Sequence, residues 1–277
     1  MKSLNQFIQE RLIIENSKND YENQPKTKEE LQETIKQRMA KGGFKVDLND
    51  IDVSHITDMS SLFEGTNFNG DISNWDVSNV TNMNAMFYRC KAFNQDISSW
   101  DVSNVTDMNS MFVWCENFNQ DISKWDVSNV TNMHTMFRDC KSFNQDISKW
   151  NVSKINNMKG MFDGCESFNQ DISSWDVSNV SDMYAMFYNC KSFNKQLNNW
   201  DISNVSNMQA MFYGCKAFNQ DISSWDVSNV TNMHAMFCKC KSFNQDISKW
   251  NVSNVKKINN IFDYCSIEEK HKPKFSV

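Results

Sequence analysis

The chain has 277 residues and a formal net charge of −6, with 28 Lys and Arg against 34 Asp and Glu. Because phosphate binding needs a basic field, this acidic balance excludes a nucleic acid or an anionic membrane as the expected main partner. Its apolar stretches are only a few residues long, whereas about 20 are needed to cross a bilayer, so we expect no membrane span.

Residues 1–45 are predicted to form an N-terminal helical cap. One apolar helical face is marked by Leu4, Phe7, Ile8 and Leu12. The polar residues QER at 9–11 interrupt this hydrophobic segment, so we predict no secretory signal peptide. The segment TKEE at 27–30 is a capping box, which predicts the start of a second helix. The apolar face of that helix carries Leu31, Ile35 and Met39.

From Asp71 onward the sequence repeats every 25 residues without a gap. Eight rows cover 71–270, and each resembles D-I-S-x-W-D-V-S-N-V-T-N-M-x-x-M-F-x-x-C-x-x-F-N-Q. Residues 47–70 form a degenerate ninth copy, one residue short, with Thr66 at the Cys position. Such a period is typical of a solenoid, in which each unit buries its apolar face against its neighbours.

The spacing of apolar residues changes partway through each row. In 97–105, Trp100 and Val102 share one face of an extended chain, which predicts a short strand. In 83–90, the apolar residues fall at i, i+3, i+4 and i+7, which predicts a short helix. Stacking would then give about nine coils over 46–270, each with a short parallel strand and a short helix, followed by a C-terminal tail at 271–277.

The pattern I-x-x-W-x-V-x-x-V resembles the L-x-x-L-x-L core of leucine-rich repeats, and M-F-x-x-C-x-x-F resembles A-F-x-x-C-x-x-L of BspA-like bacterial surface repeats. The unit FNQDISxWDVSNVTNM is close to the DUF285 repeats of mycoplasma and other bacterial proteins, over about residues 44–265. The fold class that we expect is therefore an α/β, leucine-rich-repeat-like solenoid. Because members of these families are regarded as adhesin-like surface proteins, the resemblance implies a bacterial cell-surface location, although this chain shows no signal peptide.

Cysteine and tryptophan recur with the same period, at eight positions each, from Cys90 to Cys265 and from Trp75 to Trp250. We predict buried ladders with reduced thiols, because equivalent positions specify no unique disulfide and lack the close pairs typical of zinc sites. An exposed row of Trp for stacking sugars is the alternative, but each Trp shares a face with the following Val or Ile. Cys238 lies outside the row, and we expect it to point outward as the most reactive thiol.

Two rows of Asp also follow the period, and like charges in neighbouring coils need compensation. We expect these carboxylates to accept backbone N–H bonds in a repeated Asx turn. The alternative hypothesis is a calcium site between coils, since clustered carboxylate oxygens bind this cation. The positions for that metal hypothesis are Asp76, Asp101, Asp126 and Asp176.

The copies differ mainly in two doublets, one between the two Met residues and one after Met-Phe. These positions are predicted to lie on the outward helix face, where sequence drift is the simplest explanation of the differences. Exposed aromatic residues are nevertheless typical anchors of protein interfaces. A partner-binding surface is therefore predicted at Tyr88, Trp114, Tyr184, Tyr188 and Tyr213.

Catalytic motifs are missing from the sequence: the seven Gly form no phosphate-binding loop, and His134 and His234 stand four coils apart. We expect a non-enzymatic repeat scaffold without a cofactor, which binds a protein partner. The family resemblance implies a host or extracellular-matrix component as that partner. The alternatives are a calcium-dependent carbohydrate binder and a structural self-assembly protein.

Overall fold

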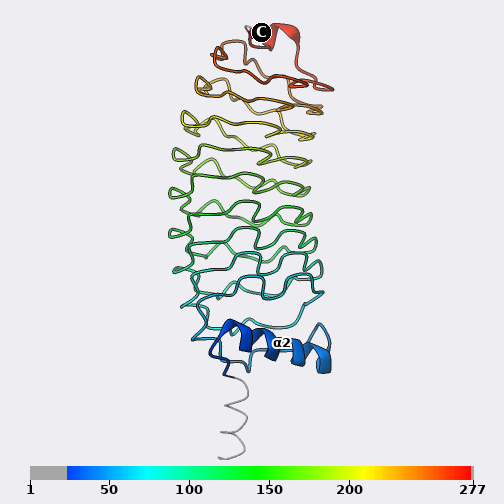
Figure 1. The fold of residues 1–277 in the computed structure, drawn as a ribbon. Helices are drawn as coiled ribbons and strands as arrows, with labels where there is room; N and C mark the ends of the chain where they lie inside the picture. Colours follow the sequence, from blue (N-terminus) through cyan, green and yellow to red (C-terminus); the bar gives the residue numbers. More distant parts are fainter. Residues whose placement is uncertain (1–23, 276–277) are drawn as a thin grey trace, which may run out of the picture.

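The structure is a computed structural model that describes residues 24–275. The chain winds into a column of stacked coils, with helix α2 (Lys28–Gly42) across one end and the short 3₁₀ helix η1 (Glu269–His271) at the other (Figure 1). The first helix expected in the cap lies outside the described residues, and this concerns Leu4, Phe7, Ile8 and Leu12.

The prediction of an α/β solenoid, with a strand and a helix in every coil, is wrong. In the described part of the chain, α2 is the one α-helix, and no strand is long enough to form a sheet. Parallel pairing between neighbouring coils is limited to isolated bridges such as that of Asp58 with Asn82. Residues 97–105, the expected strand, and residues 83–90, the expected helix, are successions of turns.

The apolar spacing of three residues comes from turns closed by hydrogen bonds between residues i and i+3. In one coil, the Trp100 N–H donates to the Ile97 carbonyl at 3.2 Å. Two residues further along, the Val105 N–H donates to the Val102 carbonyl at 2.9 Å. All four side chains are at most 4% exposed, so both ends of each turn face the core.

The second half of a coil divides its backbone hydrogen bonds between its own turns and the next coil. The Met83 N–H donates to the Asp107 carbonyl of the next coil at 2.9 Å. The Met86 N–H instead donates to the Met83 carbonyl within its own coil at 3.2 Å. In an α-helix, each N–H would donate to the carbonyl four residues earlier in the same coil. No N–H would then remain for the neighbouring coil. Because a helix of two turns is marginal by itself, the bonds between coils prevail.

Aromatic side chains stack in columns through the core. The ring centroids of Phe87 and Phe112 are 5.5 Å apart, with an interplanar angle of 3°. The Trp100 Nε1–H donates to the Ile72 carbonyl of the preceding coil at 3.1 Å. The periodic Trp residues are 3–6% exposed, so the predicted core row is confirmed and an exposed sugar-stacking row is excluded.

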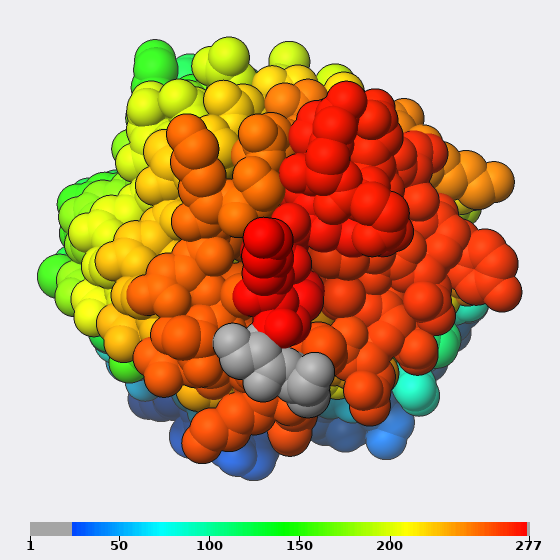
Figure 2. Space-filling model, turned by 90° about the horizontal axis from the view of Figure 1, so that it is seen from above, coloured from blue at the N-terminus to red at the C-terminus, as the bar shows by residue number. Residues whose placement is uncertain are grey.

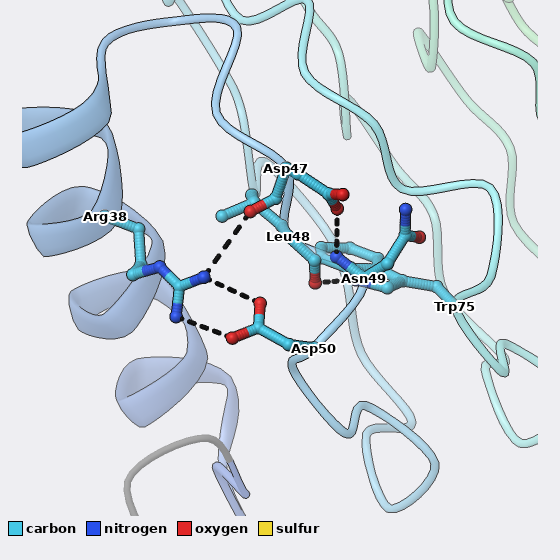
Figure 3. A network of polar contacts seen from close by, with 6 residues as sticks. All are labelled: Arg38, Asp47, Leu48, Asn49, Asp50 and Trp75. Carbon is cyan, nitrogen blue, oxygen red and sulfur yellow. Dashed lines mark hydrogen bonds and ion pairs between the residues drawn. The ribbon is translucent and has the colours of Figure 1, made fainter. Parts of the chain in front are cut away.

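Helix α2 closes the N-terminal end of the stack. It begins after Thr27, as the capping box predicts, and the Thr27 side chain accepts the Glu30 N–H at 3.2 Å. Leu31 is fully buried in the same core as the coils. Figure 3 shows how the Arg38 guanidinium donates to both carboxylate oxygens of Asp50 in the first coil, at 2.9 and 2.7 Å.

At the opposite end, residues 266–275 lie against the last coils, as the end-on view in Figure 2 shows in red. The Ile247 N–H donates to the His271 carbonyl at 3.0 Å. Phe275 packs, partly buried, against the core. The two ends of the column are therefore covered by segments that do not follow the repeat, which limits the exposure of its apolar interior.

Candidate functional site

A surface groove of about 530 Å³ crosses five neighbouring coils. All twelve residues that line it belong to the two doublets in which the copies differ. The groove is therefore built from the residues that the repeat leaves variable. Its lining consists of Tyr88, Arg89, Ser110, Val113, Trp114, His134, Thr135, Arg138, Lys159, Gly160, Asp163 and Tyr184.

Backbone hydrogen bonds hold corresponding doublets of successive coils against one another. The Arg89 N–H donates to the Val113 carbonyl at 2.7 Å, and the Trp114 N–H donates to the Arg138 carbonyl at 2.8 Å. Arg89 and Trp114 adopt the left-handed conformation, with φ of 59° and 64°. A non-glycine residue rarely adopts this conformation, so the bonds between coils impose it on the groove.

Cationic groups lie over the aromatic rings of the groove. The Arg89 guanidinium carbon is 5.3 Å from the Tyr88 ring centroid and 5.1 Å from that of Trp114. The Lys159 ammonium is 5.1 Å from the Tyr184 ring centroid. Each cation over a ring contributes about 0.5–1 kcal/mol at an exposed site. Rings and cations therefore hold one another in place along the groove.

Only part of the positive charge in the groove is neutralised. The Arg138 Nε lies 3.1 Å from a carboxylate oxygen of Asp163 and 3.6 Å from one of Asp139. By contrast, no carboxylate of residues 24–275 forms an ion pair with Arg89 or Lys159. The groove thus has an excess of positive charge although the whole chain is acidic.

Two titratable groups of the groove are shifted by burial. Burial raises the pKa of Asp163 to about 6, although the charge of Arg138 opposes this effect. Burial lowers the pKa of His134, and the positive charges of Lys159 and Arg138 act in the same direction. His134 is therefore neutral at pH 7, whereas Asp163 is charged but close to its midpoint.

Three of the five aromatic residues predicted as a binding surface, Tyr88, Trp114 and Tyr184, line the groove. Tyr188 and Tyr213 lie outside this lining and stack on each other, with centroids 4.5 Å apart. The surface that these five residues were predicted to form is thus divided into the groove and a separate tyrosine pair.

The aromatic residues of the groove were predicted from the sequence, whereas its cations were not; these cations are Arg89, Arg138 and Lys159. All three occupy the same variable doublets as the aromatics. The signal available in the sequence was therefore positive charge at variable positions of an otherwise acidic chain.

The Asp rows form the Asx turns that the sequence predicts. Asp76 Oδ1 accepts the Ser78 N–H at 3.1 Å and the Ser78 hydroxyl at 2.6 Å. The hydrogen bond from the Ser78 side chain holds the pKa of Asp76 below its usual value. The same backbone bond is made by Asp101, Asp126 and Asp176. Within the described residues, no three His, Cys, Asp or Glu side chains gather as a metal site would require, and the calcium hypothesis stays a prediction.

The periodic cysteines are free and buried, as predicted, apart from Cys265, which is partly buried. Burial raises the pKa of the Cys90 thiol to about 11, so its reactive thiolate form is disfavoured. The prediction that Cys238 points outward is wrong, because its side chain is only 6% exposed and burial raises its pKa. The same position of the repeat is half-buried at Tyr88, Asp163, Tyr188 and Tyr213, and a side chain as small as Cys is covered by its neighbours there.

The fold and the groove define a tandem-repeat protein whose constant residues build a column and whose variable residues build a surface. A family model described as Mycoplasma protein of unknown function, DUF285, matches residues 30–142, 115–206 and 189–275. The chain therefore belongs to the DUF285 family, and the resemblance seen in its repeats is confirmed. A search of curated proteins found no match. No helix of the described residues combines the length and the apolar composition that a bilayer crossing requires.

Proposed function

We propose that this protein is a non-enzymatic repeat scaffold that recognises another protein through the groove. The observation that carries the proposal is the coincidence of the groove lining with the variable doublets. The other positions of the repeat build turns and core, and therefore repeat nearly the same residues from coil to coil. A surface made of the remaining positions can change its recognition without changing the fold.

The chemistry of the lining supports binding. Half-buried aromatic rings and arginines are the residues that most often anchor protein interfaces. The carboxylate of Asp163 is paired with Arg138, which leaves it poorly placed to act as a free general base. The likeness to BspA-like surface repeats supports an adhesin-like role at the cell surface, with a host or extracellular-matrix protein as partner.

Binding can be tested with the purified chain and with a variant that carries Tyr88→Ser, Trp114→Asn and Tyr184→Ser. Capture of extracellular-matrix proteins by the wild-type chain should be lost in this variant, because its aromatic anchors are gone. Tyr264→Asn is the matched control, because Tyr264 occupies the same position of its repeat as Trp114 and also has a positive φ, of 57°. Its side chain lies outside the groove and is 79% exposed.

Circular dichroism and thermal unfolding would establish that all variants remain folded. Equal capture by the wild-type chain and the triple variant would refute the groove as the binding surface. Capture that depends on calcium and survives in the triple variant would favour the carbohydrate-binding alternative instead.

A further inference from the structure

We infer that the groove recognises an acidic peptide segment of its partner, in extended conformation, whose carboxylates bind Arg89 and Lys159. The inference rests on the proposed function and adds the chemistry of the partner. It follows from three features of the groove: its unneutralised cations, their separation along the column, and the contacts that its aromatic rings already make with those cations.

Charge complementarity is the first argument. Three cationic side chains line the groove, and Asp163 is the one carboxylate in that lining. The Asp163 carboxylate forms an ion pair with Arg138, whose Nε lies 3.1 Å from one of its oxygens. Arg89 and Lys159 are therefore available to a ligand. A guanidinium binds a carboxylate through two parallel hydrogen bonds, and an ammonium binds one as a compact charge.

The separation of the two cations is the second argument. Arg89 belongs to the coil at 71–95 and Lys159 to the coil at 146–170, so three coil steps separate them. At roughly 4.8 Å per step, the two residues stand about 14 Å apart along the column. An extended peptide rises about 3.3 Å per residue, so its two carboxylates should be about four residues apart.

The aromatic rings provide the third argument. A sugar ring needs an open aromatic face, whereas Tyr88 and Trp114 share the guanidinium of Arg89, and Tyr184 lies under Lys159. These contacts also restrict the cationic side chains before any ligand arrives. Less conformational entropy is then lost on binding, which favours a ligand with carboxylates over one that stacks on the rings.

The charge of Asp163 opposes an acidic ligand, which gives the interaction a pH dependence. Asp163 faces Arg138 and Asp139 of the preceding coil, and the Tyr188 phenol lies near it in the following coil. Its pKa of about 6 means that mild acid neutralises it while the carboxylates of a peptide, near 4, stay charged. The affinity for the acidic peptide should therefore increase as the pH falls from about 7.5 to about 5.5. Asp163→Asn should bind more tightly at the higher pH.

The direct test uses fluorescence anisotropy of a labelled Ser/Gly peptide with two Glu residues about four positions apart. The wild-type chain should bind it, and the peptide with Gln in place of both Glu should bind at least roughly tenfold more weakly. The variant with Arg89→Gln and Lys159→Gln should bind the Glu peptide more weakly than the wild-type chain does, by the same factor. Lys239→Gln is the matched control, because Lys239 occupies the same position of its repeat as Arg89 and has φ of 64°. It lies outside the groove lining.

Equal affinity for the Glu and Gln peptides, or unchanged binding by the double variant, would overturn the inference. Stronger competition by inorganic phosphate or a sulfated sugar than by the unlabelled Glu peptide would assign the groove to another anion and would overturn it as well. A partner that is lost with the aromatic anchors but retained by the double variant would leave the proposed function standing and reject only the acidic segment.

Discussion

At the scale of single residues, Asp163 shows how a groove residue can oppose the stability of the stack. Its pKa is raised from 3.8 to about 6, because burial disfavours the carboxylate more than Arg138 favours it. The folded chain therefore binds this proton more tightly than the unfolded chain does. The stability that the proton contributes is complete below about pH 4 and is lost as the pH rises through about 6.

Replacing Asp163 by Asn should raise the free energy of unfolding at about pH 7.5 by about 3 kcal/mol, since the pKa is raised from 3.8 to about 6 and one pKa unit corresponds to about 1.4 kcal/mol. Near pH 4 the variant and the wild type should be equally stable, because Asp163 is then protonated. Urea unfolding at both pH values measures the two differences. A gain of the same size at both pH values would show that packing, not the charge, is responsible.

At the scale of the structural element, each coil is a succession of turns that places apolar residues at i and i+3. The second half of the coil includes left-handed residues, such as Ala85 with φ of 53° and Arg89 with φ of 59°. Glycine occupies two such positions in the coil at 146–170, Gly160 and Gly164. The left-handed conformation costs a residue with a Cβ about 1–2 kcal/mol, which the bonds between coils offset.

A pair of glycine substitutions separates this conformational cost from the contacts between coils. Gly65→Ala should lose about 1 kcal/mol of stability, because Gly65 has φ of 71° and its added Cβ would meet no atom within 4 Å. Gly164→Ala should lose up to about 1 kcal/mol more, because its Cβ would lie 2.5 Å from Asp139 Oδ1 and 3.3 Å from Asp139 Cα of the preceding coil, so that the Asp139 side chain must rotate away from Arg138. Urea unfolding of both variants gives the difference, and equal losses would contradict the close approach.

At the scale of the whole molecule, the contribution of a core residue to stability depends on its place along the column. Phe162 is fully buried, and its ring stacks on Phe137 at 5.9 Å and on Phe187 at 5.8 Å. Phe262 occupies the same row in the last coil, where its ring stacks on Phe237 at 5.9 Å and is only partly buried. A middle residue thus has aromatic neighbours on both sides, whereas an end residue has one.

Phe162→Ala should therefore cost about 3–5 kcal/mol of unfolding free energy, as expected for a large buried aromatic. Phe262→Ala should cost about 1–2 kcal/mol, because less area is buried and the end of the column can relax around the change. Equilibrium unfolding in urea compares the two. Losses of equal size would show that the last coil is packed as tightly as the middle.

The whole molecule also shows why net charge was a poor guide to the groove. The charge of −6 predicted no broadly anionic partner, yet many of the carboxylates that produce it accept hydrogen bonds in Asx turns, as at Asp76. Within residues 24–275, neither Arg89 nor Lys159 forms an ion pair with a carboxylate. Local charge therefore differs in sign from the total, and only the spatial arrangement of the doublets reveals it.

Four features can be read from the sequence alone: the repeat period, the buried positions of Trp, Phe and Cys, the Asx turns and the family. Each of these depends on residue identities that recur at fixed spacing. The tertiary structure decided how a coil is built, because a spacing of three, as from Met83 to Met86, suits a turn as well as a helix. Hydrogen bonds to the next coil select the turns, and they exist only once coils stack. Stacking likewise brings Arg89 against Trp114 and Lys159 against Tyr184, which no single repeat contains.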